Sequence, residues 1–251
     1  MRRLLTVTFL HFSAFAWASV PAWADKTGTI AGKVTFEGSP PAMPEIDLRD
    51  PACAAGLEPH AHQAWVVVER GGVAGTLVRL AVGSVADRAA RPATPAPAVI
   101  DQKGCLYRPR VVGVVAGQKV AFRNSDPTVH NVHTYTGQDA DVNQVMTAGA
   151  RDLVLDVPAS AGDTPYRVRC DIHPWMDAFV VVTDHPYFAT SSADGTFRID
   201  NVPAGTYTIE AWHPYLGKKT ATVTVKPGQT ADTKLPAYQT GDYQPPAQAS
   251  P

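Results

Sequence analysis

Residues 170–176 read Cys-Asp-Ile-His-Pro-Trp-Met and place a thiol, an imidazole and a thioether close together in the chain. These side chains are soft or borderline ligands of the kind that copper binds. The stretch lies between two segments whose apolar and alternating residues are typical of β-strands. We therefore expect Cys170, His173 and Met176 on a tight loop that joins two neighbouring strands at one end of a sheet.

A second histidine is needed to complete a known ligand set. A cysteine and two histidines in a plane, with a more distant methionine, form the mononuclear copper centre of electron-transfer proteins. His130 qualifies, because it opens an extended segment directly after the strand expected at 118–124 and the turn at 124–127. His133 is a rival, but three residues from His130 it should point to the opposite side of a strand. The plainer alternative is that all these residues only fill a core or a turn.

The N-terminus is typical of an exported protein. Arg2 and Arg3 precede a long apolar run, and Pro21 and the small-residue site at 22–24 follow, which predicts a cleaved signal peptide. The alternative is a membrane anchor, although His11 interrupts the run. Cleavage removes two arginines and moves the formal net charge from −1 to −3, so no basic surface for nucleic acid is indicated. We expect a periplasmic protein with no membrane span after cleavage.

The chain has three cysteines, so one stays unpaired if the other two form a bridge. Cys53 and Cys105 both lie in turn-rich sequence, where an oxidising compartment favours a disulfide. We predict that these two are bridged, with two free buried thiols as the alternative. Cys170 is then the unpaired thiol, and it is the one beside a histidine and a methionine.

The rest of the sequence predicts an all-β protein. Many short segments alternate or cluster apolar residues between glycine, proline, asparagine and aspartate, and helical periodicity is nearly absent. This pattern in a chain of 251 residues favours antiparallel sandwiches. The expected strands are 28–36, 64–70, 76–83, 110–117, 118–124, 151–158, 166–170, 178–184, 196–200, 205–212 and 219–228.

Three stretches of the sequence resemble the cupredoxins, the blue copper proteins. CDIHPWM is similar to the Cys-x-x-His-Pro-x-Met loop of their amicyanin type. VHNVHT (129–134) is similar to the segment that carries the other histidine, and VVAGQKVAFRNSD (114–126) to the strand before it. The resemblance covers roughly residues 97–183. Val129 departs from the pattern, because these proteins usually have proline before the histidine.

The resemblance implies a Greek-key sandwich that binds one Cu(I)/Cu(II) ion, with His130, Cys170 and His173 as equatorial ligands and Met176 as the axial ligand. It also implies that Asn131 ties the first histidine segment to the ligand loop. His173 is expected to serve as the electron port, and Pro174 and Trp175 to form an apolar docking patch beside it. We expect the indole of Trp175 either to lie exposed for a partner or to pack against a second sandwich, near Tyr187 or Tyr215.

A second family resemblance covers other parts of the chain. SADGTFRIDNVPAGTYTIEAWHP (192–214) is similar to carboxypeptidase regulatory-like, or transthyretin-like, sandwiches, and GTIAGKVTFEG (28–38) is similar to their first strand. The copper-type domain is therefore a candidate insertion into a small second β-sandwich. The expected domains are a signal peptide at 1–24, an N-terminal β segment with an Ala/Pro-rich linker at 25–96, the copper domain at 97–183, the regulatory-like sandwich at 184–236 and a disordered tail at 237–251.

Four other histidines are candidates for a second metal site or for ordinary packing. His60 and His62 lie two residues apart and would share one face of an extended chain, but a solvated pair is the plainer interpretation. His185 and His213 each precede a proline and an aromatic residue. We favour packing at the junction of the two sandwiches for these, because no sulfur ligand is adjacent.

The ligand set also restricts the function. Four protein ligands leave no open position for a substrate, and a catalytic metal needs one. We therefore predict a non-enzymatic protein that passes single electrons between redox partner proteins. Two alternatives stay open, namely a periplasmic copper chaperone or storage protein with the same ligands, and a binding or scaffold module with a structural copper site. The sequence identifies neither the redox partner nor the oligomeric state.

Overall fold

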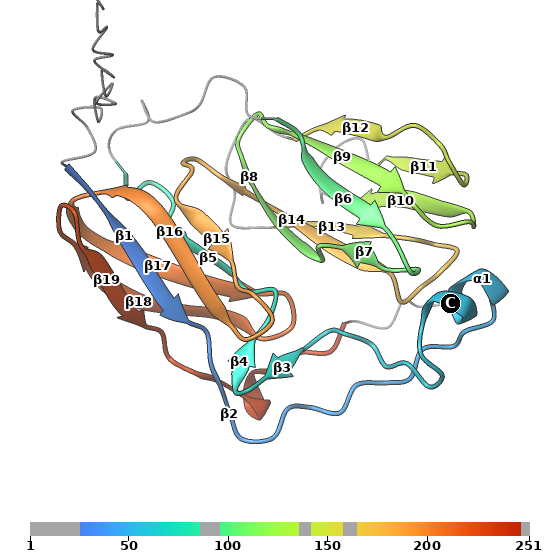
Figure 1. Ribbon diagram of the computed structural model, residues 1–251, viewed down its shortest axis with the longest axis horizontal. Coiled ribbons are helices and arrows are strands. Elements are labelled where there is room, and N and C mark those ends of the chain that lie inside the picture. Colours follow the sequence, from blue (N-terminus) through green and yellow to red (C-terminus); the bar gives the residue numbers. More distant parts are fainter. Residues whose placement is uncertain (1–25, 86–95, 136–141, 158–164, 247–251) are drawn as a thin grey trace, which may run out of the picture.

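The computed structural model describes residues 26–85, 96–135, 142–157 and 165–246, which form two β-sandwiches (Figure 1). The prediction of an all-β fold is confirmed, because α-helix in the described residues is confined to α1 (Pro51–Gly56). None of the described helices is long and apolar enough to span a membrane. The signal peptide expected at 1–24 lies outside the described residues.

The first sandwich, drawn in green and yellow in Figure 1, packs a five-stranded sheet against a four-stranded sheet. The five-stranded sheet has the order β11-β10-β13-β14-β8, with the strands β8 (Val111–Val115), β10 (His130–Tyr135), β11 (Asn143–Met146), β13 (Tyr166–Arg169) and β14 (Asp177–Thr183). The four-stranded sheet has the order β12-β9-β6-β7, with β6 (Ala98–Gln102), β7 (Tyr107–Arg108), β9 (Lys119–Asn124) and β12 (Leu153–Asp156).

The second sandwich combines strands from the beginning and the end of the chain. One sheet has the order β16-β1-β19, with β1 (Thr27–Lys33), β16 (Thr196–Pro203) and β19 (Thr230–Lys234). The other has the order β15-β5-β17-β18, with β5 (Leu77–Leu80), β15 (Phe188–Thr190), β17 (Gly205–His213) and β18 (Gly217–Val225). The first sandwich thus lies, in sequence, between β5 and β15 of the second.

Strand β14 explains why the two sandwiches pack against each other. All its residues are buried, which is expected of a strand covered on both faces. Val180 and Val182 point into the core of the first sandwich, whereas Phe179 and Val181 belong to the core of the second. The ring of Phe179 meets Trp212 edge-on, with centroids 5.8 Å apart. The junction is therefore a continuous apolar layer rather than a linker.

A long excursion of the chain covers one end of the first sandwich. After β2 (Phe36–Glu37) the chain runs to α1 and returns to β3 (Val68–Glu69), which pairs with β4 (Gly72–Val73) (Figure 1). We call residues 44–63 the lid. Its two ends are held together by backbone hydrogen bonds, from Gln63 N to Pro44 O at 2.8 Å and from Ile46 N to Ala61 O at 2.8 Å. Ile46 and Cys53 are buried in the core of the first sandwich.

The disulfide prediction is confirmed, because Cys53 in α1 is bonded to Cys105 in the turn between β6 and β7. The predicted disorder of 237–251 is wrong for its first residues. Tyr238 in β20 (Tyr238–Gln239) is fully buried, and its hydroxyl donates to the carbonyls of Ala211 and Gly217 at 2.9 and 3.0 Å. A buried phenol with two acceptors holds this segment in place, beside β2 and a 3-10 helix (Thr240–Asp242).

Candidate metal centre

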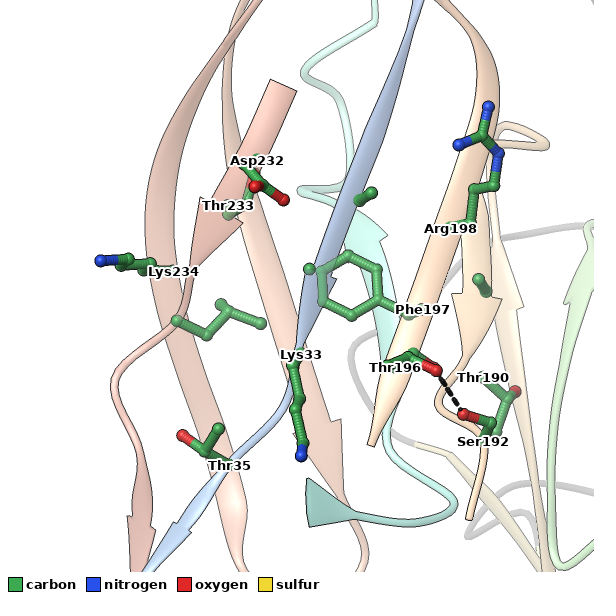
Figure 2. Close-up of a pocket in the computed structure, with 14 residues that line it drawn as sticks. Lys33, Thr35, Thr190, Ser192, Thr196, Phe197, Arg198, Asp232, Thr233 and Lys234 are labelled. Carbon is green, nitrogen blue, oxygen red and sulfur yellow. Dashed lines mark hydrogen bonds between the residues drawn. The ribbon is translucent and has the colours of Figure 1, made fainter. Parts of the chain in front are cut away.

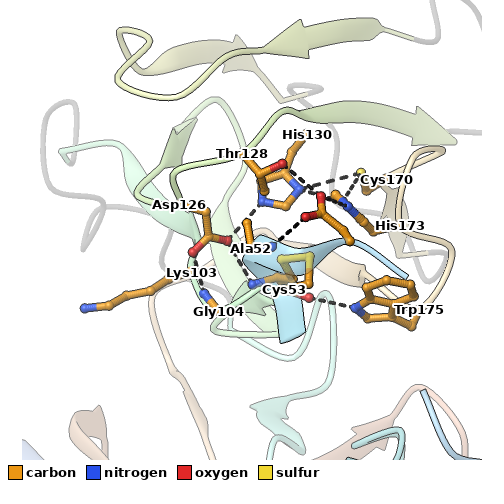
Figure 3. Close-up of a disulfide and its surroundings, with 12 residues drawn as sticks. Ala52, Cys53, Lys103, Gly104, Asp126, Thr128, His130, Cys170, His173 and Trp175 are labelled. Carbon is orange, nitrogen blue, oxygen red and sulfur yellow. Dashed lines mark hydrogen bonds and ion pairs between the residues drawn. A yellow bond between two sulfur atoms is a disulfide. The ribbon is translucent and has the colours of Figure 1, made fainter. Parts of the chain in front are cut away.

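Three predicted ligands lie together at the end of the first sandwich that the lid covers (Figure 3). His130 begins β10, and Cys170 and His173 lie on the loop between β13 and β14. The Nδ1 atoms of the two histidines are 2.9 Å apart, and the Sγ of Cys170 is 4.0 Å from the Nδ1 of His130 and 3.8 Å from that of His173. All three side chains are at most 2% exposed. The three side chains therefore form a compact cluster that is buried from solvent.

Short turns at the strand ends bring these donors together. Asn124 ends β9, and its side chain accepts from the N–H of Asp126 at 3.0 Å and donates to the carbonyl of Thr128 at 2.9 Å, which shapes the turn before His130. The ligand loop closes on itself, because the N–H of Cys170 donates to the carbonyl of Met176 at 3.2 Å. Backbone and side-chain hydrogen bonds thus hold both loops in place.

Each histidine contacts a carboxylate through its other ring nitrogen. The Nε2 of His130 lies 2.9 Å from Asp126 Oδ2, and the Nε2 of His173 lies 3.1 Å from Asp50 Oδ2 in the lid. A carboxylate accepts hydrogen bonds and so favours a proton on the nitrogen that faces it. A histidine protonated only on the nitrogen that faces its carboxylate directs an unprotonated Nδ1 toward the thiol.

The surroundings of His130 favour its neutral form over imidazolium. Burial is the largest influence on His130 and lowers its pKa, even though the nearby carboxylate of Asp126 acts in the other direction. Without a proton, the lone pairs of two Nδ1 atoms converge at close range, which is unfavourable. A cation between the two Nδ1 atoms removes this repulsion, and so does a proton on one Nδ1 that is donated to the other across 2.9 Å.

The thiol is also suited to a metal. Burial raises the pKa of Cys170, while backbone N–H groups of Asn131, His173 and Ile172 act to lower it. These N–H groups provide hydrogen bonds for a thiolate once a cation replaces its proton.

The donor separations fit a first-row transition metal. With bonds of about 2.0 Å to nitrogen and about 2.3 Å to sulfur, a trigonal-planar ion requires nitrogen–sulfur separations of about 3.8 Å. The observed nitrogen–sulfur separations of 3.8 and 4.0 Å match this requirement, whereas the two nitrogens, 2.9 Å apart, are about 0.6 Å closer than the about 3.5 Å that the same geometry requires. Met176 is fully buried in the same hydrophobic cluster as Cys170.

Asn131 connects the two loops, as the sequence indicated. Its side-chain oxygen accepts from the N–H of Asp171 at 2.7 Å, and its amide donates to Asp171 Oδ2 at 2.9 Å and to Asn143 Oδ1 at 2.8 Å. The rival His133 lies outside the cluster. Its Nδ1 is 2.9 Å from Asp171 Oδ2, and its ring stacks on Tyr135.

The predicted electron port and docking patch need correction. His173 is only 2% exposed, because Asp50 of the lid covers its outer nitrogen.

Trp175 is 8% exposed, and its Nε1 donates to the carbonyl of Cys105 at 2.9 Å. Its ring packs within the first sandwich, not near Tyr187 or Tyr215, so both expectations for this residue were wrong. The β6–β7 turn supplies the indole with its hydrogen-bond acceptor, the carbonyl of Cys105. Pro174 is exposed.

The remaining histidines do not join the cluster. His60 lies exposed in the lid, with its Nδ1 2.7 Å from Glu45 Oε1, and His62 is exposed. His185 is buried between backbone groups, with its Nε2 3.1 Å from the carbonyl of Leu80. His213 is buried too, and its Nδ1 accepts from the N–H of Tyr215 at 3.2 Å. Within the described residues, neither pair belongs to a group of potential metal ligands.

Among the hollows in the described residues, two bear on where the chemistry lies. A groove between the lid and the ligand loop reaches the outer side of His173, and its walls include Glu45, Asp47, Ile172 and Pro174. A larger hollow lies on the sheet of β1, β16 and β19 in the second sandwich, where Thr196 and Ser192 form a hydrogen bond at its edge (Figure 2). It is lined by no histidine or cysteine, so we place the chemistry at the buried cluster.

Sequence reasoning missed Asp50 and Asp126. Asp126 lies four residues before His130 in the same turn, which is a signal that it could orient that histidine. Asp50 precedes Pro51 and caps α1 by accepting from the N–H of Ala52 at 2.7 Å. Aspartate followed by proline is a helix-start signal, but it does not show which surface the helix covers.

Comparisons with known proteins find similarities over parts of the chain. Residues 173–236 match the model of the carboxypeptidase regulatory-like domain family, which confirms the predicted resemblance of the second sandwich. No curated protein matches the chain. Similar solved structures include a copper-containing nitrite reductase from Thermus scotoductus SA-01, at 21% identity and a TM-score of 0.31. That match covers 41% of this chain and only 25% of the reductase.

Two small copper proteins are also similar to part of the chain. A purple cupredoxin from Nitrosopumilus maritimus shares 20% identity over 34% of this chain and 99% of its own, with a TM-score of 0.29. A mutant of amicyanin in its Cu(I) form shares 23% identity over 42% of this chain and 97% of its own, with a TM-score of 0.31.

Proposed function

We propose that this chain binds one copper ion at His130, Cys170, His173 and Met176 and passes single electrons between redox partners. The observation that carries the proposal is the convergence of two Nδ1 atoms and a thiol at 2.9 to 4.0 Å in a buried cluster. Thiolate, imidazole and thioether together favour copper over hard cations such as Mg²⁺ or Ca²⁺. When bound, copper supplies the one-electron change between Cu(I) and Cu(II).

The chain's own residues supply rigidity. Asn131 ties the two loops, and the lid fixes His173 from outside. A donor set held by the protein in this way changes little between oxidation states, which keeps the reorganisation that accompanies electron transfer small. The resemblance to amicyanin-type loops supports the same interpretation.

The arrangement supports an electron carrier over an enzyme or a chaperone. Four donors leave no open position for a substrate. A chaperone must hand its metal to a partner, and ligands at most 2% exposed are poorly placed for that exchange.

We propose a periplasmic location, because the predicted signal peptide and the disulfide both fit an exported protein. The partner is a redox protein, and we place its approach at the groove that His173 helps to line.

Copper titration of paired histidine variants tests the proposal. The mature protein should bind one copper ion and show a reversible one-electron couple. His130→Gln should abolish both properties, whereas His133→Gln should retain them, because His133 lies outside the cluster. Equal losses in the two variants, or copper binding that needs neither histidine, would contradict the assignment.

A further inference from the structure

The two carboxylates beside the histidines have matching hydrogen-bond sets. In Asp126, Oδ1 accepts from the N–H of Gly104 at 2.7 Å, and Oδ2 accepts from the N–H of Cys105 at 2.8 Å and from His130 at 2.9 Å. Each oxygen therefore has a defined donor, and the carboxylate is fixed between the β6–β7 turn and His130.

Asp50 has the same pattern in the lid. Its Oδ1 accepts from the N–H of Ala52 at 2.7 Å, and its Oδ2 accepts from the hydroxyl of Thr128 at 2.9 Å and from His173 at 3.1 Å. Both carboxylates thus accept three hydrogen bonds, of which one comes from a histidine.

The disulfide joins the two parts of the chain that fix these carboxylates. Cys53 lies in the helix that Asp50 caps, and the N–H of Cys105 is bound by Asp126. Potential ligand atoms of Cys53, Cys105 and His173 lie within 4.8 Å of one another, so the bond passes directly outside the cluster. The carbonyl of Cys105 also accepts from Trp175, which lies on the ligand loop (Figure 3).

We propose that Asp50 and Asp126 are positioning residues for the metal-binding histidines, and that the Cys53–Cys105 bond couples these two aspartates. The lid is then a structural part of the metal centre and controls how long the metal is retained. This inference rests on the proposed copper function. It assigns a role to a segment, residues 44–63, that lies outside the ligand loops in sequence.

The physical basis is the direction of the hydrogen bonds. Both Nε2 atoms must carry a proton if both Nδ1 atoms are to bind a metal, and a buried N–H needs an acceptor. In Asp50→Asn the side chain keeps one oxygen. This oxygen can take the place of the wild-type Oδ1, which accepts from the N–H of Ala52. The other position becomes an NH₂ donor that faces the N–H of His173. The variant therefore keeps the helix cap and loses the contact that orients the ring.

Asp50→Asn and Asp47→Asn form a matched pair of variants. Both remove one negative charge from the lid, but Asp47 contacts Arg49 instead of a histidine. We expect Asp50→Asn to speed the loss of copper to a competing chelator by about 10- to 100-fold, with Asp47→Asn close to the wild type. Asp126→Asn should have the same effect as Asp50→Asn through His130.

Nitrogen chemical shifts of the histidines in the metal-free protein provide a readout that does not depend on copper. Wild type and Asp47→Asn should show the Nε2–H tautomer at His173, whereas Asp50→Asn should shift this residue toward the Nδ1–H tautomer. An unchanged tautomer together with wild-type copper loss in Asp50→Asn would overturn the positioning role. If the wild type itself bound no copper, the proposed function would fail, while the tautomer shift would still test the contact.

The coupling through the disulfide is tested with Cys53→Ser/Cys105→Ser. We expect this double variant to lose copper at least as fast as Asp50→Asn, and adding Asp50→Asn to it should change the rate little, because both changes act through the lid. Circular dichroism first establishes that the variant keeps its β-sheet signal. If the double variant unfolds, we test instead a wild-type protein whose lid backbone is cleaved once while the disulfide stays intact. This nicked protein should still retain its copper. Fully additive effects, or copper loss in the nicked protein equal to that of Asp50→Asn, would contradict the coupling.

Discussion

At the scale of single residues, the candidate site depends on protonation as much as on position. His130 and His173 each have one nitrogen toward a carboxylate and one toward Cys170. The carboxylates favour the tautomer with the proton on Nε2, and in that tautomer both Nδ1 lone pairs point toward the centre of the cluster. A cluster of the same three residues without Asp50 and Asp126 would have no preference for a proton on the Nε2 atoms of the histidines. The aspartates are thus as informative about the site as the donors themselves.

A buried histidine far from the cluster makes a prediction about acid stability. Burial, and next the charge of Arg110, lower the pKa of His213 to about 3. Between about pH 6.5 and that value the unfolded chain binds a proton here and the folded chain does not, so the free energy of unfolding falls as the pH falls. His213→Gln should weaken this dependence. Urea unfolding at pH 7 and pH 5 measures it, with the exposed His60→Gln as the control. An equal pH dependence in His213→Gln and wild type would disprove the assignment.

At the scale of elements, the lid determines how the ligand loop packs. The loop residue Trp175 is buried because Cys105 offers its indole an acceptor and its ring belongs to the same apolar cluster as the lid residues Ile46 and Cys53. Ile172, on the same loop, is 48% exposed. One short loop therefore contains both a core residue and a surface residue, and the difference comes from a segment more than a hundred residues earlier in the chain.

Two alanine variants compare these positions. Trp175→Ala should lower the free energy of unfolding by about 3–5 kcal/mol, because it removes a large buried side chain. Ile172→Ala removes a half-exposed side chain and should cost clearly less. Guanidinium denaturation of the metal-free proteins measures both. The burial of Trp175 would be refuted by equal, small losses of stability.

The ligand loop and the lid differ in how far the sequence could predict them. Cys170, His173 and Met176 are close in the chain, and a motif of that kind can be read directly. Asp50 and His173 are separated by 123 residues, and no local pattern indicates that α1 covers this end of the sandwich. The strand β14 was predictable from its apolar run, whereas β20 was not, because its burial depends on two carbonyls from other strands.

At the scale of the whole molecule, the two sandwiches meet at a buried ionic group as well as an apolar layer. Asp177 directly follows Met176 and is 3% exposed. It accepts a hydrogen bond from the hydroxyl of Tyr215 in the second sandwich and pairs with Arg110 at 3.3 Å and Arg167 at 3.4 Å. The second sandwich is thus linked to the residue next to the predicted axial ligand.

Removing one hydroxyl tests this link. Tyr215→Phe should lower the free energy of unfolding by about 1–3 kcal/mol, because a buried carboxylate loses a donor. Tyr207→Phe is the control, since its hydroxyl donates only to the carbonyl of Pro203 in a less buried setting. Thermal melting of both variants provides the comparison. A melting temperature for Tyr215→Phe as high as that of Tyr207→Phe would contradict a stabilising role of the junction.

The central claim is that Cys170, with His130 and His173, binds a single copper ion. The most direct measurement is the visible absorption spectrum of the mature protein loaded with Cu(II), beside that of Cys170→Ser. We predict an intense thiolate-to-copper band in the wild type and its complete loss in Cys170→Ser, with the same β-sheet signal in both proteins. A colourless copper-loaded wild type, or a Cys170→Ser variant that keeps the band, would contradict the account.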